Sequence, residues 1–474
     1  MTSRTMTKWV VVLTAIGSLM AALDTLVVST ALNRIRLDLG ASVGQLEWTV
    51  NAYNLSFAVL LITGAALGDR YGRRNLYAAG LGLFAAASAL AALAPNVGVL
   101  IAARAVQGAG SALIMPLGLA LLSAAFPAEK RGAALGIFSA ITGIAVASGP
   151  LVGGAVVEGI DWQWIFWINV PIGLAAIPFV LTKLRESHGP ETALDLRGLT
   201  LITLGALATV WGLVRGNQVG WDSVEVVGAL VTGVVMTIAF VAWERRAREP
   251  MLSLELFRSR AFSAGNAAIF LTFASLFGAV FFYAQLLQTG LGYSPLEAGL
   301  RLIPWTATFI TVAPIAGALA DKIGERPLMV TGLSLQALGM AWLALIANAD
   351  MSYTQLLGPF IVGGVGVSMA IPAAQNSVVA SVPDLAIGKA AGANSMMREL
   401  GGVFGVAVVV AVFAAAGGYA SPSAFVDGFG PAIGVTAALS AIGAVAGLAL
   451  PGRRPAGARG LARAVPALET DGGS

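Results

Sequence analysis

Fourteen long apolar runs divide this chain of 474 residues, and they constrain its fold more than any other feature. A helix needs about 20 apolar residues to cross a hydrocarbon core of about 30 Å, and most of the runs reach that length. Hydrophobic residues make up 57% of the chain and charged residues only 11%, more apolar surface than a soluble core of this length buries. We therefore expect an all-α membrane protein whose runs are spanning helices.

The fourteen expected spans follow one another with short polar connections. The first run has an Asp inside it and is longer than the apolar part of a signal peptide, so we interpret it as a retained span. The expected spans are 9–32, 46–68, 75–94, 97–124, 133–157, 162–182, 198–214, 225–243, 261–287, 296–319, 327–347, 354–380, 390–416 and 430–450.

The placement of lysine and arginine predicts the orientation of these spans. With the N-terminus in the cytoplasm, 23 of the 28 basic residues fall on inner segments, four fall on outer segments, and Arg104 lies within a span. Basic residues accumulate on the cytoplasmic side of membrane proteins. We therefore expect a multi-pass protein of a bacterial inner membrane with both termini in the cytoplasm. The net charge of +4 is spread over short loops, so we expect no nucleic-acid partner.

An internal repeat predicts the domain organisation. The segment around Asp69 recurs around Asp321, 252 residues later, and Ser42 and Ser294 each stand 27 residues before those aspartates as candidate helix N-caps. Repeated halves are typical of transporters. We expect two six-helix bundles, at 1–182 and 256–450, an inserted transmembrane helix pair at 183–255, and a disordered cytoplasmic tail at 451–474.

The turn between the second and third runs carries one acid and three arginines. It reads Gly-Asp-Arg-Tyr-Gly-Arg-Arg at 68–74, and its glycine suits a sharp backbone turn. This spacing resembles the signature between spans two and three of major facilitator superfamily transporters, with Ala65 replacing the usual glycine. The resemblance implies the major facilitator fold and a gating role for Asp69, Arg70, Gly72, Arg73 and Arg74, and for Asp321 in the repeat.

Glycines recur around one proline in the fifth run. Pro150 removes a helix hydrogen bond, and glycines one turn apart allow close helix contact, although generic packing would explain the glycines alone. The segment resembles the signature that separates antiporters from symporters in this superfamily. The residues that carry it are Gly143, Gly149, Pro150, Gly153 and Gly154.

Charges inside apolar spans are candidates for proton handling. Counting 1.5 Å per residue puts Asp24 in the first span and Arg104 in the fourth at nearly one depth. The surroundings of Arg104 resemble the fourth-span signature in which this arginine is tied to proton handling. The alternatives are that Arg104 snorkels to the outer surface, that it hydrogen-bonds backbone carbonyls, or that Asp24 and Arg104 form a permanent ion pair. Glu399 follows Arg398 near the start of span thirteen, as a surface ion pair or a second protonatable site.

Further segments narrow the resemblance to the fourteen-span drug:proton antiporters of the EmrB/QacA type. They are 23–32, 162–173, 292–299 and 399–402, and the resemblance covers residues 8–450. Side chains in span nine could line a cavity that accepts cations through aromatic faces, or could simply pack. The candidates for a substrate cavity are Tyr53, Gln107, Asn169, Phe281, Tyr283 and Gln285.

These patterns predict a proton-coupled multidrug efflux antiporter that exports cationic or lipophilic compounds by alternating access. The alternatives are a dedicated exporter of one endogenous metabolite or antibiotic and, from another class, a non-transporting membrane sensor or scaffold with a transporter fold. No phosphate-binding loop, metal motif or nucleophile constellation occurs in the sequence. We therefore expect no enzyme activity, cofactor or metal, and a monomer whose partners are small-molecule substrates, protons and the lipid bilayer.

Overall fold

The computed structural model describes residues 3–126, 141, 144–145, 148–189, 195–252, 254–382 and 387–451. These described residues are helical throughout, apart from short turns and connections. Among them, thirteen helices are long and apolar enough to cross a membrane. Thirteen of the fourteen expected spans are thereby confirmed as helices. About half of the fifth expected span, 133–157, falls outside the described residues, and its described residues 141, 144–145 and 148–157 are helical.

The helices run in chain order as follows. The first part contains α1 (Ser3–Leu39), α2 (Val43–Tyr71), α3 (Arg73–Ala92), α4 (Val97–Ala125), α6 (Trp164–Trp167), α7 (Asn169–Lys183), α8 (Leu196–Val219) and α9 (Val224–Glu244). The second part contains the 3₁₀ helix η1 (Leu254–Arg258), α10 (Arg260–Gln285), the π-helix η2 (Leu286–Gly290), α11 (Pro295–Arg301), α12 (Ile303–Ile323), α13 (Glu325–Ile346), α14 (Tyr353–Val379), α15 (Ile387–Ala416) and α16 (Pro422–Leu448).

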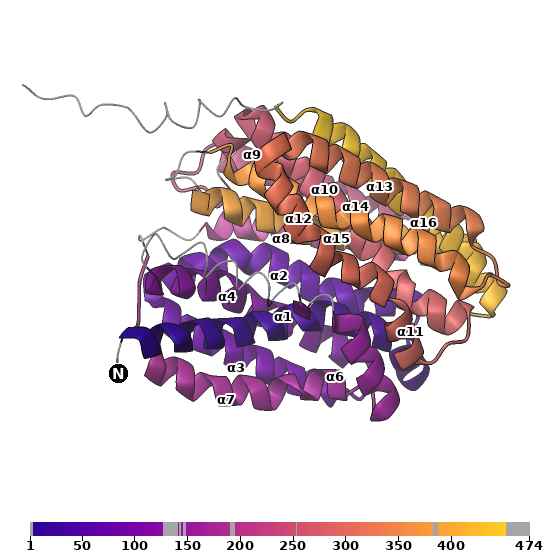
Figure 1. The fold of residues 1–474 in the computed structure, drawn as a ribbon, viewed down its shortest axis with the longest axis horizontal. Coiled ribbons are helices and arrows are strands. Elements are labelled where there is room, and N and C mark those ends of the chain that lie inside the picture. Colours follow the sequence, from indigo (N-terminus) through magenta and orange to yellow (C-terminus); the bar gives the residue numbers. More distant parts are fainter. Residues whose placement is uncertain are drawn as a thin grey trace, which may run out of the picture.

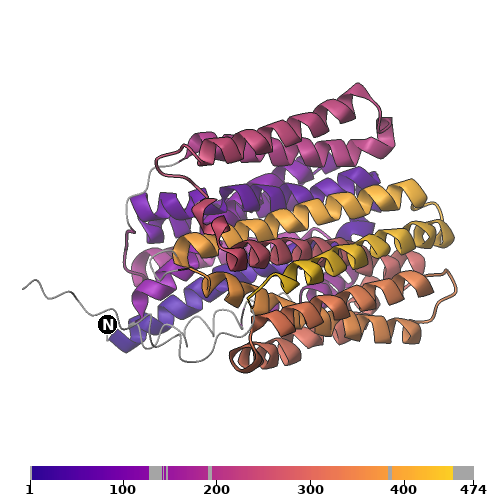
Figure 2. The same ribbon diagram turned by 90° about the horizontal axis from the view of Figure 1, so that it is seen from above.

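These helices form two bundles and a separate hairpin. Helices α1–α4, α6 and α7 form the N-bundle, and α10–α16 form the C-bundle, with the long axes of both running across Figure 1. Helix α2 packs along α15 between the bundles, and α1 contacts α10 and α11. Figure 2 shows the hairpin of α8 and α9 at the top edge of the molecule, where α8 packs against both α2 and α15.

The turns that frame the repeat have the same construction in both bundles. Ser42 and Ser294 each cap a helix with a reciprocal capping box, which confirms both as N-caps. Gly72 joins α2 to α3 with a φ of 106°, and Gly324 joins α12 to α13 with a φ of 88°. Because residues with side chains rarely adopt such angles, glycine is required at both turns. The repeated sequence therefore encodes a repeated turn.

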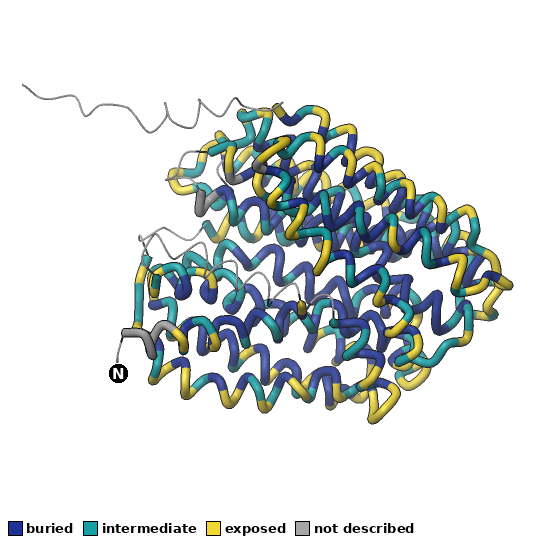
Figure 3. The backbone as a smooth tube through the Cα atoms, in the orientation of Figure 1, coloured by how far each residue is buried: buried dark blue, intermediate teal, exposed yellow. Residues whose placement is uncertain are grey.

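The buried core joins the two bundles through two apolar clusters, one of which holds Leu55, Ala58 and Val59 of α2 with Ala390, Ala393 and Met396 of α15. Residues 26–35 of α1 belong to the other of these clusters with α10, η2 and α11, near the end of the molecule where α11 lies. The other half of the N-bundle, around Phe57, Tyr77 and Leu117, forms a cluster without C-bundle members. We name the two ends the α11 end and the turn end, after α11 and Gly72. Figure 3 shows the buried residues concentrated where the bundles meet. The bundles are thus closed against each other at the α11 end.

Several element boundaries differ from the expected spans. Helix α16 begins at Pro422, eight residues before the expected start, because Ser421 caps it. The tenth span is broken at Leu302 into α11 and α12, and the ninth ends in the π-helix η2. The domain boundaries at 182 and 255 stay a prediction. Residues 452–474 of the expected tail lie outside the described residues.

Candidate functional site

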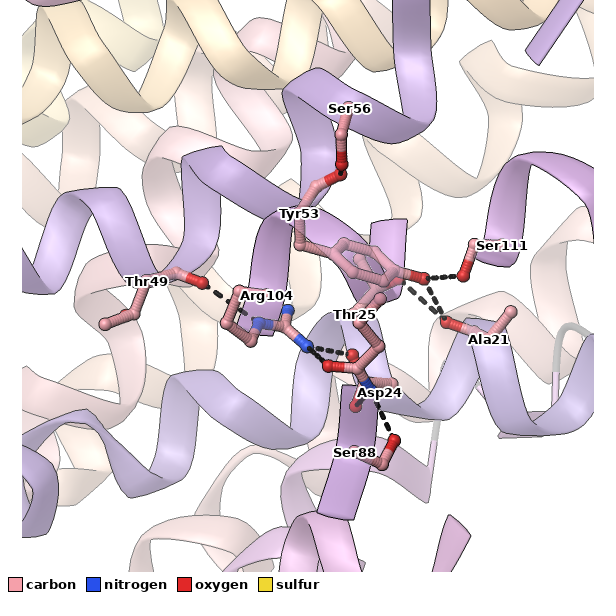
Figure 4. Close-up of polar contacts among 10 residues, drawn as sticks. Ala21, Asp24, Thr25, Thr49, Tyr53, Ser56, Ser88, Arg104 and Ser111 are labelled. Atoms are coloured by element: carbon pink, nitrogen blue, oxygen red, sulfur yellow. Dashed lines mark hydrogen bonds and ion pairs between the residues drawn. The ribbon is translucent and has the colours of Figure 1, made fainter. Parts of the chain in front are cut away.

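A buried ion pair lies in the middle of the N-bundle. Arg104 of α4 donates from Nη1 to Oδ2 of Asp24 in α1. Arg104 is 1% exposed and Asp24 is 0% exposed, so neither side chain reaches solvent in this conformation. The equal depths counted along the two helices are therefore matched by direct contact (Figure 4). Snorkelling of Arg104 to the surface is excluded in this state.

Neutral side chains complete the hydrogen bonds of the pair. Gln107, one turn after Arg104, donates to Asp24 Oδ1 at 2.8 Å and to Ser88 Oγ at 2.9 Å. Its Oε1 accepts from Arg104 Nη1 at 2.8 Å, and Arg104 Nε donates to the carbonyl oxygen of Thr49 at 3.0 Å. The arginine guanidinium also lies over the Tyr53 ring, 4.3 Å from its centroid. The charges are therefore solvated by protein groups in place of water.

Sequence reasoning missed three members of this network. Ser88 of α3 accepts a hydrogen bond from Gln107, and the carbonyl oxygen of Thr49 in α2 accepts one from Arg104. Ser111 of α4 forms a hydrogen bond with the Tyr53 hydroxyl at 2.7 Å. Small hydroxyl residues are common in membrane helices, where they usually bond to their own helix backbone. No local signal marks them, because each is defined by its position in the folded bundle.

The second candidate acid lies deeper than a surface ion pair. Glu399 is 5% exposed and lies 12 residues into α15, because that helix begins at Ile387. It pairs with Arg398, whose Nη2 is 2.8 Å from Glu399 Oε1, and the Arg398 guanidinium lies 5.7 Å from the Phe273 ring centroid. The surface interpretation is therefore wrong for Glu399, and its protonation role stays a prediction.

The gating turn is held within the N-bundle. Asp69 accepts from Arg73 Nε at 2.7 Å across Gly72, so the acid and base of the motif close the turn on themselves. The backbone carbonyl of Asp69 also accepts from Gly189 N at 3.1 Å. Arg70 lies over the ring of its neighbour Tyr71, at 5.4 Å from the centroid. The side chain of Asp321, the repeat's candidate, lies outside the described part of the chain.

Glu186 is a partner of the gating turn that the sequence did not reveal. It follows α7 and accepts from the backbone N–H groups of Arg74 and Asn75 at 2.8 and 3.2 Å, the first turn of α3. Its carboxylate is also 3.8 Å from Arg74 Nε. A carboxylate at a helix N-terminus complements the helix dipole. This acid ties the loop after α7 to the start of α3, which lies about 110 residues earlier in the chain.

The glycine motif of 148–159 lies between α1 and α11. A Cβ on Gly149 would lie 2.9 Å from Leu26 Cβ, and a Cβ on Gly299 of α11 would lie 2.6 Å from the carbonyl oxygen of Pro150. A Cβ on Gly153 would likewise collide with Thr30 and Val27 of α1, and a Cβ on Gly154 would collide with the backbone of Pro295. The motif is therefore the point where the two bundles come within backbone contact. Gly143 lies outside the described residues.

Polar contacts reinforce this junction at the α11 end. Gln288 Nε2 donates to the carbonyl oxygen of Thr30 at 2.9 Å, and the Arg36 guanidinium lies 4.7 Å from the Tyr419 ring centroid. Leu296 N donates to Oε2 of Glu158 at 2.9 Å. Hydrogen bonds from Ser294 and from this amide hold the pKa of Glu158 below its usual value. Glu158 is therefore an ionised carboxylate that accepts a hydrogen bond from the first turn of α11.

The six substrate-cavity candidates fall into two separate groups of buried side chains. Tyr53 and Gln107 belong to the Arg104 network, whereas Tyr283 donates to Met340 Sδ at 2.9 Å inside the C-bundle. Gln285 accepts from the Tyr419 hydroxyl and donates to the carbonyl oxygen of Phe281. Asn169 is 2% exposed, and within the described part of the chain its Nδ2 has no hydrogen-bond partner. In this conformation the structure does not bring these residues together, and their role stays a prediction.

Two cavities border the α8–α9 hairpin. The larger, about 650 Å³, is apolar and lies between α2, α4, α8 and α9, with Trp48 and Trp211 in its wall. The smaller, about 290 Å³, lies between α2, α8 and α15 at the α11 end, and Glu47 is in its wall. None of the six substrate candidates lines either cavity.

Comparison with known families and proteins gives extended matches. The sequence profile of the Major Facilitator Superfamily matches residues 14–406 and again residues 266–467. The tetracenomycin C resistance and export protein of Streptomyces glaucescens is 34% identical over 424 residues, 89% of this chain and 78% of the relative. The multidrug resistance protein Stp of Mycobacterium tuberculosis is 35% identical over 85% of this chain and 75% of its own length. The cephamycin export protein CmcT of Amycolatopsis lactamdurans is 33% identical over 93% of this chain and 92% of its own length.

Solved structures share the fold at low sequence identity. A peptide transporter crystallised with sulfate superposes with a TM-score of 0.69 at 15% identity, covering 95% of this chain and all of the other. The crystal structure of a D-xylose-proton symporter gives a TM-score of 0.66 at 18% identity, covering 94% of this chain and 98% of the other. At these identities the likeness concerns the arrangement of helices.

Proposed function

Because this chain belongs to the Major Facilitator Superfamily, a family of transporters, we propose that it is a proton-coupled exporter of cationic or lipophilic compounds. Relatives that align over most of the chain are named as multidrug resistance or antibiotic export proteins, which supports efflux over uptake. Two bundles that share an apolar cluster at the α11 end support alternating access, in which the bundles rock about the substrate; the N-bundle cluster around Phe57, Tyr77 and Leu117 has no C-bundle member. The chain is then a transporter rather than an enzyme.

The observation that carries proton coupling is the buried Asp24–Arg104 pair. An ion pair in the apolar middle of a bundle is costly to desolvate, and removing one partner leaves an uncompensated charge. A carboxylate in such a site can exchange a proton when its partner moves, because separation removes the compensating charge. A cationic substrate that compensates Asp24 would favour the carboxylate, and its departure would favour reprotonation.

The glycine motif supports exchange in place of co-transport. Its residues resemble the antiporter signature, and the close contacts at Gly154 and Gly299 place them against α11, where the two bundles meet at the α11 end. We propose that the junction opens to the outside with substrate and closes again with protons.

The positive-inside distribution supports a location and an orientation. Most basic residues fall on the segments that the sequence assigns to the cytoplasmic side, and α1 begins at the turn end (Figure 1). In our proposal the turn end and both termini face the cytoplasm of a bacterial cell, and the α11 end faces outward. The described conformation is then closed to the outside. The exporter acts as a monomer in the bilayer, and the substrates and protons are its partners.

A dedicated antibiotic exporter is the second candidate. Relatives named for a single compound, tetracenomycin C or cephamycin, align as well as those named for multidrug resistance. Drug susceptibility of an efflux-deficient host separates the two functions. A multidrug exporter protects against several chemical classes, whereas a dedicated exporter protects against one.

Proton flux in inverted vesicles tests the coupling. Adding a cationic dye to vesicles that contain the wild-type protein should release protons, and Asp24→Asn should abolish this release while the protein still folds. The Asp350→Asn variant, which changes an exposed loop acid between α13 and α14, is the matched control and should behave as wild type. Normal dye-driven proton release by folded Asp24→Asn protein would remove Asp24 from the mechanism.

A further inference from the structure

A second buried acid, Glu47, lies one turn into α2 at the α11 end. It is 1% exposed, and Asn51 Nδ2 donates to its Oε1 at 3.1 Å. Among the described residues, Glu47 has no other hydrogen bond and no ion pair. It therefore differs from Asp24, whose charge Arg104 compensates. A buried carboxylate without a cation is strongly unfavourable, and such a group takes up a proton.

The charged groups on the elements around α2 are engaged elsewhere or lie far along the helix. Arg104 is on the other side of α2, Arg34 of α1 is exposed, and Arg215 of α8 pairs with Glu225 at 2.8 Å. The remaining ones are Asp24, Arg36 and Asp38 on α1, Arg73 and Arg74 on α3, Arg197 on α8, and Arg398 and Glu399 on α15, each with a partner of its own.

Glu47 and the Arg104 network lie on opposite sides of α2. Thr49 and Tyr53 contact Arg104, whereas Glu47 is two residues before Thr49, or about 200° around the helix. Asn51 follows Glu47 by four residues and Asn54 follows Asn51 by three, so all three lie on the same face of the helix. Asn51 Oδ1 and both polar atoms of the Asn54 side chain are buried and unpartnered in the described structure. This face is a buried polar stripe with unused hydrogen-bonding capacity.

The polar stripe faces the junction of three units. The cavity of about 290 Å³ at Glu47 is walled by α2 of the N-bundle, by α15 of the C-bundle, including Ala411 and Ala414, and by α8 of the hairpin. Asn217 of α8 donates to the carbonyl oxygen of Ala411, which ties the hairpin to α15 at the cavity. Any rocking that separates α2 from α15 at the α11 end must open this cavity to the outside.

We propose that Glu47 is a second proton-binding site, which takes up a proton from the outer side before the α11 end closes. The inference deepens the proposed function, on which it rests for the direction of transport. With the bundles apart, water reaches Glu47 and stabilises its carboxylate. With the bundles together, α15 and α8 wall the cavity beside Glu47 and provide no cation, so closure favours the neutral acid. The α8–α9 hairpin thereby acquires a role as the wall that keeps this acid away from lipid.

Outer-face accessibility at controlled pH tests the proposal. The chain has no cysteine, so Thr289→Cys provides a single label site in η2, where the Thr289 hydroxyl is buried and unpartnered. An impermeant maleimide is applied from the outside to cells or proteoliposomes, and the labelling rate at each pH is divided by that of an Asp350→Cys protein, whose exposed cysteine reports the intrinsic rise of thiol reactivity with pH. This normalised rate should be roughly fivefold or more higher at about pH 8.5 than at about pH 6, because ionised Glu47 holds the α11 end open.

Glu47→Gln is the decisive variant. Glutamine keeps the size of the side chain and an oxygen that accepts from Asn51, so it imitates the protonated acid. The normalised labelling rate should then be low at both pH values, with a ratio below about twofold. Glu255→Gln, which changes an exposed acid in η1, is the matched control and should retain the wild-type ratio. The proposal would be overturned if the Glu47→Gln variant kept the wild-type labelling ratio, or if the Thr289→Cys protein that retains Glu47 showed no effect of pH on labelling.

The result also separates this inference from the proton-flux test. If Asp24→Asn leaves dye-driven proton release intact while Glu47→Gln abolishes the pH effect on labelling, the Glu47 site stands and the coupling site is wrongly assigned. If Asp24→Asn abolishes release and Glu47→Gln leaves the labelling ratio unchanged, the coupling proposal stands and the Glu47 proposal falls.

Discussion

Breaking the Asp24–Arg104 pair from each side gives a quantitative test of its energetics. Arg104→Met leaves the Asp24 carboxylate buried with Gln107 as its only remaining donor in the network. Losing one partner of a buried pair costs about 3–5 kcal/mol. Asp24→Asn is milder, because asparagine keeps an acceptor for Gln107 and the guanidinium keeps Thr49 and the Tyr53 ring. We expect about 1.5–3 kcal/mol for this variant, the cost of a lost charged hydrogen bond.

The double variant Asp24→Asn with Arg104→Met leaves no charge in the site. Neutral replacements of buried pairs are often close to neutral in stability. The two single effects would sum to about 4.5–8 kcal/mol if they were independent, so we expect the double variant to be at least about 2 kcal/mol more stable than that sum. These free energies of unfolding are measured by equilibrium unfolding in mixed detergent micelles, in which a rising fraction of dodecyl sulfate denatures the protein.

An exposed pair of the same chemistry is the control for this cycle. Arg215 and Glu225 are 2.8 Å apart and 32% and 41% exposed, so the effects of Arg215→Met and Glu225→Gln on stability should be additive. Additivity of the Asp24 and Arg104 variants within about 0.5 kcal/mol would refute the reasoning, because it would mean that the two charges do not compensate each other in the folded protein.

Two further predictions concern the ends of the bundles. Asp69→Asn should lower the free energy of unfolding by less than about 1 kcal/mol, since the pair with Arg73 is partly exposed, yet should reduce dye efflux several-fold if the turn gates transport. Normal efflux would show that the turn serves orientation only. At the other end, hydrogen bonds lower the pKa of Glu158, so its contact with Leu296 is present at neutral pH and is lost only as pH falls through that lowered value. Glu158→Gln should therefore leave the pH dependence of maleimide labelling between about pH 6 and about pH 8.5 unchanged, and a flattened dependence would contradict this assignment.

The sequence predicted much of the candidate site because membrane helices are regular. Depth follows from counting residues along a helix, so Asp24 and Arg104 were expected at one level before any contact was known. The position of Glu399 near the start of the expected span suggested a surface ion pair, but α15 begins at Ile387 and its packing buries this side chain. Partners such as Ser88 and Glu186 could not be predicted, since their roles depend on contacts with residues 19 and about 110 positions away in the chain.

By itself the sequence determined the class of fold, the repeat and the turns. Apolar length dictates a spanning helix in lipid, glycine is required where φ is positive, and serine caps a helix through bonds to its own first turn. Only the tertiary structure decided which charges are compensated. Asp24 and Glu47 are both acids in apolar helices, but one meets an arginine and the other faces a cavity beside α8 and α15. That difference arises from the side of the helix on which each acid lies and from what packs there, and electrostatic compensation in a low-dielectric core depends on distances that no local pattern encodes.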